Sequence, residues 1–382
     1  MSKRASRLVA NLMVAICCLT STHEVDAQQT DRPVAFVHGI SSDGGTWQTM
    51  APYLASLYRI RAVQPSLPSN GHASFEAQAV ALKSYLQSDT TQVILVAHSN
   101  GGIVSRLARQ NGLDVQSITT IGSTHLGAPL AANVLNGKVG AWGGNFIFKL
   151  TDAFAQAPSS WWSWIRWLLN LFRFAVDQWS SAIQAAISLF TSSWAVLPQM
   201  VPYGPFQSNV IGQPNGNGSP ESAIPRRVSI QVFTQQPTTG IFFAGTAPAH
   251  RSAGIAGRTA MIAIYSMISQ YYQSSAWSAA PLSQKRAEHS AAAARFAAGA
   301  TALLAMDAKW CEMIGAAPTS FTLSPNSCAL SDGVVPLVNQ NWSGATSILT
   351  TAAGHGAETS NVDIAGLVGQ LTFDFNGAVP RR

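Results

Sequence analysis

The fold is decided by the stretch Val93-Ile94-Leu95-Val96-Ala97-His98-Ser99-Asn100-Gly101-Gly102. An apolar run of strand length leads directly into a serine between small residues, and a helical pattern follows at once. Such a sharp turn forces the serine into a strained backbone conformation and lifts its hydroxyl clear of the sheet. Small residues are needed two positions before and after the serine, and Ala97 and Gly101 meet that need. The pattern predicts that Ser99 is a nucleophile.

Short apolar runs alternate with helical patterns on both sides of this stretch. Strand-like runs lie at residues 34–37, 58–63, 93–97 and 117–121, and helical patterns lie at 47–57, 75–86 and 101–110. This rhythm predicts the α/β class, with a mostly parallel sheet flanked by helices. Later segments with a clear pattern are a strand near 228–233, two alanine-rich helical stretches before Trp310, and an apolar run at 347–351.

The middle of the chain has a different character, with an aromatic-rich stretch at residues 139–205. Polar residues recur every three or four positions across 161–181, which predicts an amphipathic helix with one aromatic face. Charges inside this helix argue against a transmembrane span. We therefore expect residues 139–220 to form a cap or lid insertion. Most of the tryptophans lie in this part of the chain: Trp142, Trp161, Trp162, Trp164, Trp167, Trp179 and Trp194.

The composition limits the class of protein. Hydrophobic residues make up 47% of the 382 residues and charged residues only 10%, so the chain can bury a full-sized core and does not resemble a disordered protein. The net charge of +6 is spread along the chain without a basic run or stripe. We therefore expect no nucleic-acid partner.

The first residues have the pattern of a cleaved signal peptide. Lys3, Arg4 and Arg7 form a basic start, an apolar stretch covers residues 8–19, and Ala27 ends a small-residue cleavage site. A lipoprotein signal is the alternative, because Cys17 and Cys18 lie near the end of the apolar stretch. We expect residues 1–27 to be removed and residues 28–382 to form a secreted or periplasmic domain without a transmembrane segment.

Two cysteines remain after that cleavage, Cys311 and Cys328. In an exported protein, two cysteines this close in sequence are expected to form a disulfide bond. Metal ligation is the alternative, although no histidine cluster accompanies the pair.

A serine nucleophile needs a histidine to take its proton and a carboxylate to hold that histidine. In this kind of fold the chain order is serine, acid, histidine. Among the later histidines, His355 lies between small residues after an apolar run, so its ring is free to reach the strand ends. We expect the other three to play no part in catalysis, with His125 shaping its loop, His250 in a loop, and His289 on a helix surface.

Asp332 is the expected acid, because Asp332-Gly333 forms a turn beside the apolar pair Val334-Val335 and precedes His355 by one strand-length segment. Asp307 and Glu312 are alternatives, but both lie in or near a helical stretch. The backbone amides of Asn100, at the start of the helix, and Ile40, after Gly39, are the expected oxyanion-hole donors.

Four motifs together resemble secreted bacterial lipases of the α/β-hydrolase superfamily: His38-Gly39-Ile40, residues 97–102, residues 120–127 and residues 331–336. The resemblance implies the α/β-hydrolase fold, a triad of Ser99, Asp332 and His355, and an oxyanion hole at Ile40 and Asn100. One related group binds calcium near the triad histidine. Here Ala357 follows Gly356 and Glu358 is the nearest acid, so we predict no metal and no cofactor.

The expected function is hydrolysis of carboxylic esters. Within this class we expect a lipase that acts on acylglycerols or other lipid esters at a lipid–water interface. A short-chain esterase, a polyesterase or an acyltransferase is possible with the same triad, because the fold alone does not select the substrate. A non-catalytic lipid-binding or folding partner is a more remote alternative.

Overall fold

The computed structural model describes residues 30–40, 42–68, 73–87, 92–155, 195–202, 223–234, 249–316, 330–351 and 354–374. The predicted signal peptide (residues 1–27), the amphipathic helix predicted at 161–181, and Cys328 lie outside these residues. The prediction of a cap at 139–220 therefore concerns a segment that is described only in part.

A six-stranded sheet forms the centre of the chain, in the order β2-β1-β3-β4-β5-β6. Each neighbouring pair is parallel, which confirms the predicted α/β class. The strands are β1 (Thr30–Val37), β2 (Ile60–Val63), β3 (Val93–His98), β4 (Val115–Ile121), β5 (Arg226–Phe233) and β6 (Thr346–Thr351).

Strand β3 lies near the middle of the sheet, between β1 and β4. Ala97, at the end of β3, is in register with Val37 on one side and Thr120 on the other. The carboxyl ends of these parallel strands therefore meet at one edge of the sheet, which is where ligands bind in open α/β sheets.

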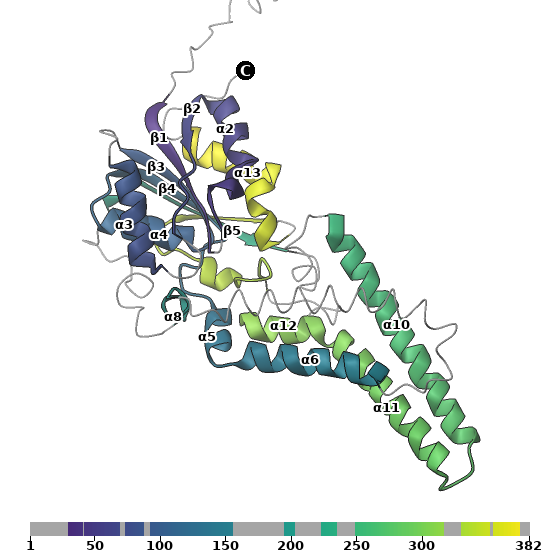
Figure 1. The fold of residues 1–382 in the computed structure, drawn as a ribbon. Helices are drawn as coiled ribbons and strands as arrows, with labels where there is room; N and C mark the ends of the chain where they lie inside the picture. The colour runs from purple at the N-terminus through teal and green to yellow at the C-terminus, as the bar shows by residue number, and fades with distance from the viewer. Residues whose placement is uncertain are drawn as a thin grey trace, which may run out of the picture.

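Helices cover both faces of the sheet, as Figure 1 shows. Ile94 and Val96 pack on one face against η1 (Gly44–Trp47), α2 (Met50–Tyr58), α13 (Val362–Val368) and η7 (Gly369–Asp374). Leu95 and Ala97 pack on the other face against α3 (Phe75–Leu86) and α4 (Gly101–Gln110). Strand residues alternate between the faces, so a strand buried on both sides is apolar along its length, as residues 93–97 of β3 are.

A second layer of helices extends away from the sheet (Figure 1). Its members are α5 (Pro129–Leu135), α6 (Lys138–Ala155), α8 (Leu197–Met200), α10 (Ala249–Ser278), α11 (Gln284–Leu304) and α12 (Met306–Ile314). The alanine-rich stretches before Trp310 become α10 and α11, which form a helical hairpin that packs on α6. The helical layer therefore contains both part of the predicted cap, residues 139–220, and residues 249–316.

Sequence signals for the ends of these helices are clear. Ser283 accepts a hydrogen bond from the Arg286 amide and so begins α11, as an N-cap serine does. Gly315 has a φ of 77° and ends α12 in the left-handed conformation that glycine adopts without strain. Among the described helices, none is long and apolar enough to cross a membrane.

A buried ion pair holds α10 to α12. Arg258 donates to the Asp307 carboxylate and also to the carbonyl oxygen of Leu303, and Asp307 is fully buried. Asp307, an alternative acid for the triad, is thus engaged within the helical layer. The other alternative, Glu312, forms an exposed ion pair with Lys309.

Replacement of the buried acid tests this packing. Asp307→Asn removes the carboxylate charge that faces the buried guanidinium of Arg258, so the free energy of unfolding should fall by about 3 kcal/mol in urea denaturation. The exposed counterpart, Glu312→Gln, should cost no more than about 0.5 kcal/mol. Equal losses in the two variants would show that the Arg258–Asp307 pair does not stabilise the layer.

Candidate active site

Ser99 lies in the turn between β3 and α4, at the carboxyl edge of the sheet. Its φ is 56°, in the left-handed region that a residue other than glycine enters only under strain. The Ser99 amide donates to the carbonyl oxygen of Ile121 on β4, and the Ser99 carbonyl oxygen accepts from the Gly102 amide. These backbone bonds hold the turn, so the hydroxyl is placed by the fold rather than by its own preferences.

The start of α4 packs directly on the end of β1. A Cβ atom on Gly101 would lie 2.6 Å from the carbonyl oxygen of His38 and 2.7 Å from that of Val37. Glycine is therefore required at this position by the neighbouring chain segment. The sequence pattern predicts a small residue here because β3 lies close to the helix that follows it. The closest neighbour of Gly101 is instead the end of β1.

The three predicted triad residues form one chain of hydrogen bonds. The Ser99 hydroxyl oxygen lies 2.8 Å from Nε2 of His355, and Nδ1 of His355 lies 2.8 Å from Oδ2 of Asp332. They come from three separate segments: the β3–α4 turn, the loop after residue 330, and the 3-10 helix η6 (His355–Ser360). The arrangement can pass a proton from a serine hydroxyl to an imidazole whose other nitrogen is held by a carboxylate.

Asp332 is fully buried and its oxygens are well bonded. Oδ1 accepts from the amides of Val334, at 2.9 Å, and Val335, at 2.7 Å. Besides His355, Oδ2 accepts from the side-chain amide of Gln340 at 3.2 Å. Gln340, in η5 (Leu337–Gln340), also bonds the backbone of Val232 in β5. No sequence pattern indicated this role for Gln340, which fixes Asp332 to the sheet.

His355 is held at both ends of its ring and by its backbone. Its amide donates to the Asp332 carbonyl oxygen at 2.9 Å. Burial alone lowers the pKa of His355, but the carboxylates of Asp332 and Glu358 raise it well above 6.5. The same surroundings act on Asp332, whose pKa is raised by burial and by Glu358 although His355 opposes the shift. The two carboxylates therefore shift the protonation equilibrium of His355 toward its charged form.

Glu358 and His98 also contact the triad, and the sequence did not assign a role to either. Glu358 is fully buried, and its Oε1 lies 3.7 Å from Nδ1 of His355. Nε2 of His98 lies 3.0 Å from Oε2 of Glu358 and donates to the carbonyl oxygen of His355 at 3.1 Å. The spacing of three residues between His355 and Glu358 was the only available signal, since it places both on one side of a 3-10 turn.

The loop after β1 lies beside Ser99. A Cβ atom on Gly39 would lie 2.8 Å from Cβ of Ser99. His38 holds the loop, because its Nε2 accepts from the Leu67 amide at 2.8 Å and its Nδ1 donates to the carbonyl oxygen of Gly39 at 2.9 Å. Burial lowers the pKa of His38, which keeps this imidazole neutral. Ile40 follows directly, so both predicted oxyanion segments flank Ser99.

The other histidines lie in different surroundings. His125 is buried, stacks on Trp342 and bonds Thr120, and burial and Arg106 hold its pKa well below 6.5. His289 lies on α11, as its helical context predicts, but it is half-buried against Tyr272 and not fully on the surface. The expectation for His250 is wrong: it lies in the first turn of α10 and not in a loop, because α10 begins at Ala249.

One group of metal-ligand residue types occurs within the described ranges. Ligand atoms of His98, His355 and Glu358 all lie within 4.8 Å of one another. Both ring nitrogens of His355 are already engaged, by Asp332 and by Ser99, so a metal here would compete with the triad. We therefore assign no metal to this cluster. Cys311 is buried in α12, and its predicted bond to Cys328 stays a prediction.

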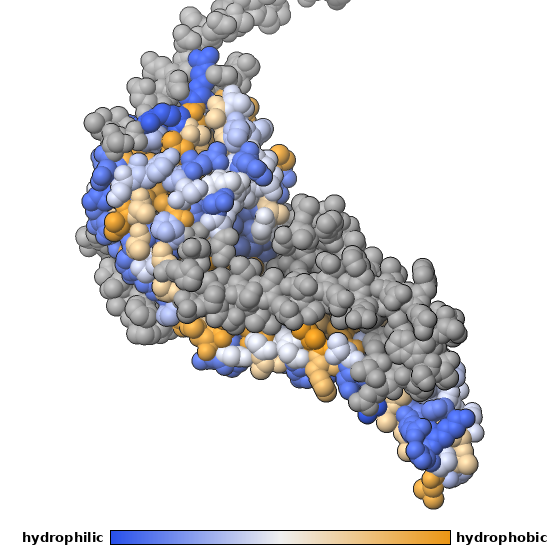
Figure 2. Space-filling model, in the orientation of Figure 1, coloured by the Kyte–Doolittle hydropathy of each residue, from blue (hydrophilic) through white to orange (hydrophobic). Residues whose placement is uncertain are grey.

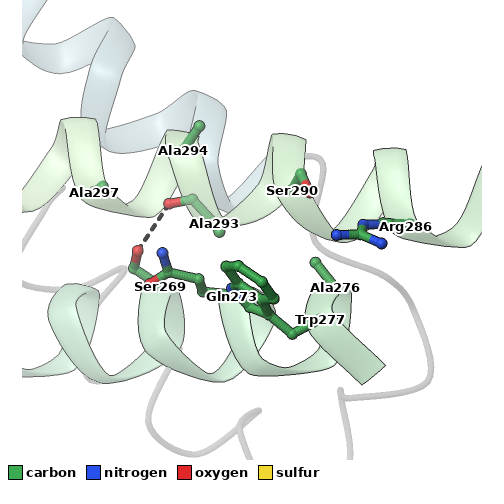
Figure 3. A pocket seen from close by; sticks show the side chains of 9 residues that line it. All are labelled: Ser269, Gln273, Ala276, Trp277, Arg286, Ser290, Ala293, Ala294 and Ala297. Atoms are coloured by element: carbon green, nitrogen blue, oxygen red, sulfur yellow. Dashed lines mark hydrogen bonds between the residues drawn. The ribbon is translucent and has the colours of Figure 1, made fainter. Parts of the chain in front are cut away.

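A pocket of about 380 Å³ lies between α10 and α11 (Figure 3). Trp277 and Arg286 line it, with the guanidinium 5.9 Å from the centre of the Trp277 ring, and Ser269 donates to the Ala293 carbonyl oxygen within it. No histidine or carboxylate lines this pocket, so it lacks a base for its serines. It therefore holds no serine–histidine–carboxylate arrangement of the kind found at Ser99.

Comparisons with known proteins give a family and several distant structures. Residues 34–220 match the model of the alpha/beta hydrolase family. No curated protein matches the sequence. Among solved structures, the lipase BlEst2 of Bacillus licheniformis is similar at 14% identity and a TM-score of 0.46, over 89% of this chain and 92% of that one.

Two further solved structures are similar over smaller parts. An extracellular alpha/beta-hydrolase from a Paenibacillus species has 14% identity and a TM-score of 0.29, over 52% of this chain and 76% of that one. A pyrethroid hydrolase from Sphingobium faniae has 18% identity and a TM-score of 0.24, over 28% of this chain and 46% of that one. The family match and the parallel sheet with its helices show the α/β-hydrolase fold.

The close approach at Gly101 can be tested by adding one methyl group. In Gly101→Ala the new Cβ would press on the His38 carbonyl oxygen, so the free energy of unfolding should fall by about 2 kcal/mol. Gly366 is the matched control, because it is exposed on α13 and nothing lies within 4 Å of its Cβ position. Gly366→Ala should raise stability by up to about 1 kcal/mol. Equal changes in the free energy of unfolding of the two variants would contradict the close contact at Gly101.

Proposed function

We propose that this chain, which is an α/β hydrolase in its fold, is a serine hydrolase of carboxylic esters. One observation carries the proposal: the unbroken chain of hydrogen bonds from Ser99 through His355 to Asp332, with Ser99 in a left-handed turn. A core serine with a structural role needs neither the strained backbone nor the aligned imidazole and carboxylate.

In the proposed reaction, the Ser99 hydroxyl oxygen attacks the ester carbonyl carbon as its proton passes to Nε2 of His355. The imidazolium then gives that proton to the leaving alcohol oxygen, and an acyl-enzyme remains on Ser99. Water, activated by His355, releases the acid. Asp332 holds the ring by its bond to Nδ1 and stabilises the positive charge, while the amides of Val334 and Val335 stabilise the carboxylate.

The oxyanion of the tetrahedral intermediate needs two donors on one side of Ser99. We assign them to the backbone amides of Asn100 and Ile40. Asn100 is the N-cap of α4, where amides and the helix dipole favour negative charge. Ile40 follows the segment that His38 anchors beside Ser99.

A lipid ester is the proposed substrate, because the helical layer exposes large apolar side chains. Phe148 on α6, Met267 and Trp277 on α10, and Leu282 at the turn of the hairpin are each more than half exposed. Figure 2 shows apolar surface along this layer and at the far end of the hairpin. Surfaces of this kind favour contact with lipid. We further propose that the protein is exported after loss of residues 1–27 and that Cys311 bonds Cys328.

Rates of hydrolysis measured on esters of different acyl chain length separate the candidate substrates. The mature protein should cleave esters of short and long acyl chains, and Ser99→Ala should reduce kcat by roughly 10⁴-fold or more at unchanged folding. A rate increase when long-chain esters pass their solubility limit supports a lipase, and a short-chain preference without such an increase indicates an esterase. Equal rates in wild type and Ser99→Ala would overturn the serine mechanism. Ser99-dependent transfer to an added alcohol in preference to water would indicate an acyltransferase.

The pH dependence follows from the state of His355, which must be neutral to accept the serine proton. Its pKa is raised well above 6.5, so kcat/KM should decline as pH falls and reach half its plateau above pH 6.5. The measurement is kcat/KM between pH 5 and pH 10 at constant ionic strength. A half-maximum below pH 6.5 would show that the carboxylates beside His355 do not act as described.

A further inference from the structure

Glu358 is a second buried carboxylate at the triad, beyond the one that the serine mechanism requires. It lies on η6 one 3-10 turn after His355 and has no exposed surface. Room for it exists because the facing residue is Gly122, with a φ of 56°, and a Cβ atom there would collide with the Glu358 carboxylate. The structure thus places a second acid directly against the catalytic histidine.

A carboxylate in this position is costly unless positive charge balances it. Neither oxygen of Glu358 accepts a well-directed hydrogen bond, since the N–H of His98 is directed at the His355 carbonyl oxygen. A buried carboxylate without such bonds loses its hydration without replacement. The groups close to it are His98 at 3.0 Å and His355 at 3.7 Å. Its burial is therefore stabilised when one of these imidazoles carries a proton.

Positive charge on His355 is formed in each turnover, because this residue takes the serine proton in the transition state. We propose that Glu358 is a positioning residue that, together with Asp332, stabilises the imidazolium of His355 and, with His98, ties η6 to the strand that carries Ser99. This inference deepens the proposed serine mechanism and rests on it. Glu358 acts through His355 and does not contact the reacting atoms.

The groups that face His355 come from several elements. Asp332 faces it from the loop after residue 330, Glu358 from its own 3-10 helix, and Ser99 and His98 from β3 and its turn, with the His98 ring 4.7 Å away. His38 lies beyond His98, and its pKa is lowered mainly by burial and to a smaller extent by the neighbouring His98. Within this set, the two acids favour a charged His355, whereas burial opposes it.

Loss of the Glu358 charge should therefore have two linked effects. In Glu358→Gln the imidazolium loses one stabilising charge, so the acidic limb of the kcat/KM profile should move to lower pH. At the high-pH plateau kcat should fall by roughly tenfold, which corresponds to about 1.4 kcal/mol of lost transition-state stabilisation. KM should change little, because Glu358 does not touch the substrate. A merely structural role would lower the amount of folded enzyme without moving the acidic limb.

Two further variants make the test sharper. Glu358→Asp keeps the negative charge but moves it away from His355, so the acidic limb of its kcat/KM profile should lie between those of wild type and Glu358→Gln. If Glu358→Gln does not fold, Glu358→Asp alone tests the inference. Asp307→Asn is the matched control, because that carboxylate is equally buried but is paired with Arg258 in the helical layer. It should lower thermal stability and leave the pH profile in place.

The outcomes separate this inference from the proposed function. If hydrolysis depends on Ser99 and the acidic limb is the same in wild type, Glu358→Gln and Glu358→Asp, Glu358 has no role in positioning and the inference is wrong. If hydrolysis by the wild type does not depend on Ser99, the serine mechanism itself fails. The inference is supported if the acidic limb moves to lower pH in Glu358→Asp and further in Glu358→Gln.

Discussion

The left-handed turn at Ser99 is the constraint on which the site depends. A residue other than glycine in this conformation costs of order 1–3 kcal/mol, and it persists only where the surroundings determine it. Here the Ser99 amide bonds β4, and Gly101 packs against the carbonyl oxygens at the end of β1. Two neighbouring segments of the fold therefore hold the hydroxyl in place. Catalysis needs this kind of preorganisation, because the geometry is then prepared before substrate binds.

The parallel sheet explains how distant segments reach one site. Parallel strands end at the same edge, so residues after β3 and in the loops around β5 and β6 come together there. Asp332 bonds Gln340, and Gln340 bonds β5, while η6 follows β6 and carries both His355 and Glu358. Asp332 and His355 are thus fixed to the same sheet that fixes Ser99, and in the function that we propose the helical layer contacts the substrate.

Much of this arrangement could be predicted from sequence, because local pattern carries it. The apolar run before Ser99, the Asp-Gly turn at Asp332 and the small residues around His355 are short-range signals. Gln340 and His98 could not be assigned in that way, since their contacts join segments far apart in the chain. Glu358 is only three residues from His355, but its burial depends on the room left by the distant Gly122. His250 was misplaced because α10 begins at Ala249, directly after Pro248, and a proline there is a signal for a helix start that the loop prediction left out.

The claim that Ser99 is an activated nucleophile has a direct chemical test. A fluorophosphonate probe reacts with serines activated by a neighbouring base, and mass spectrometry of a proteolytic digest identifies the modified residue. We predict one adduct, on Ser99, which forms faster as pH rises through the pKa of His355 and is lost on unfolding in urea. Adducts on other serines with Ser99 unmodified, or labelling of Ser99 at the same slow rate in the unfolded chain, would contradict the account.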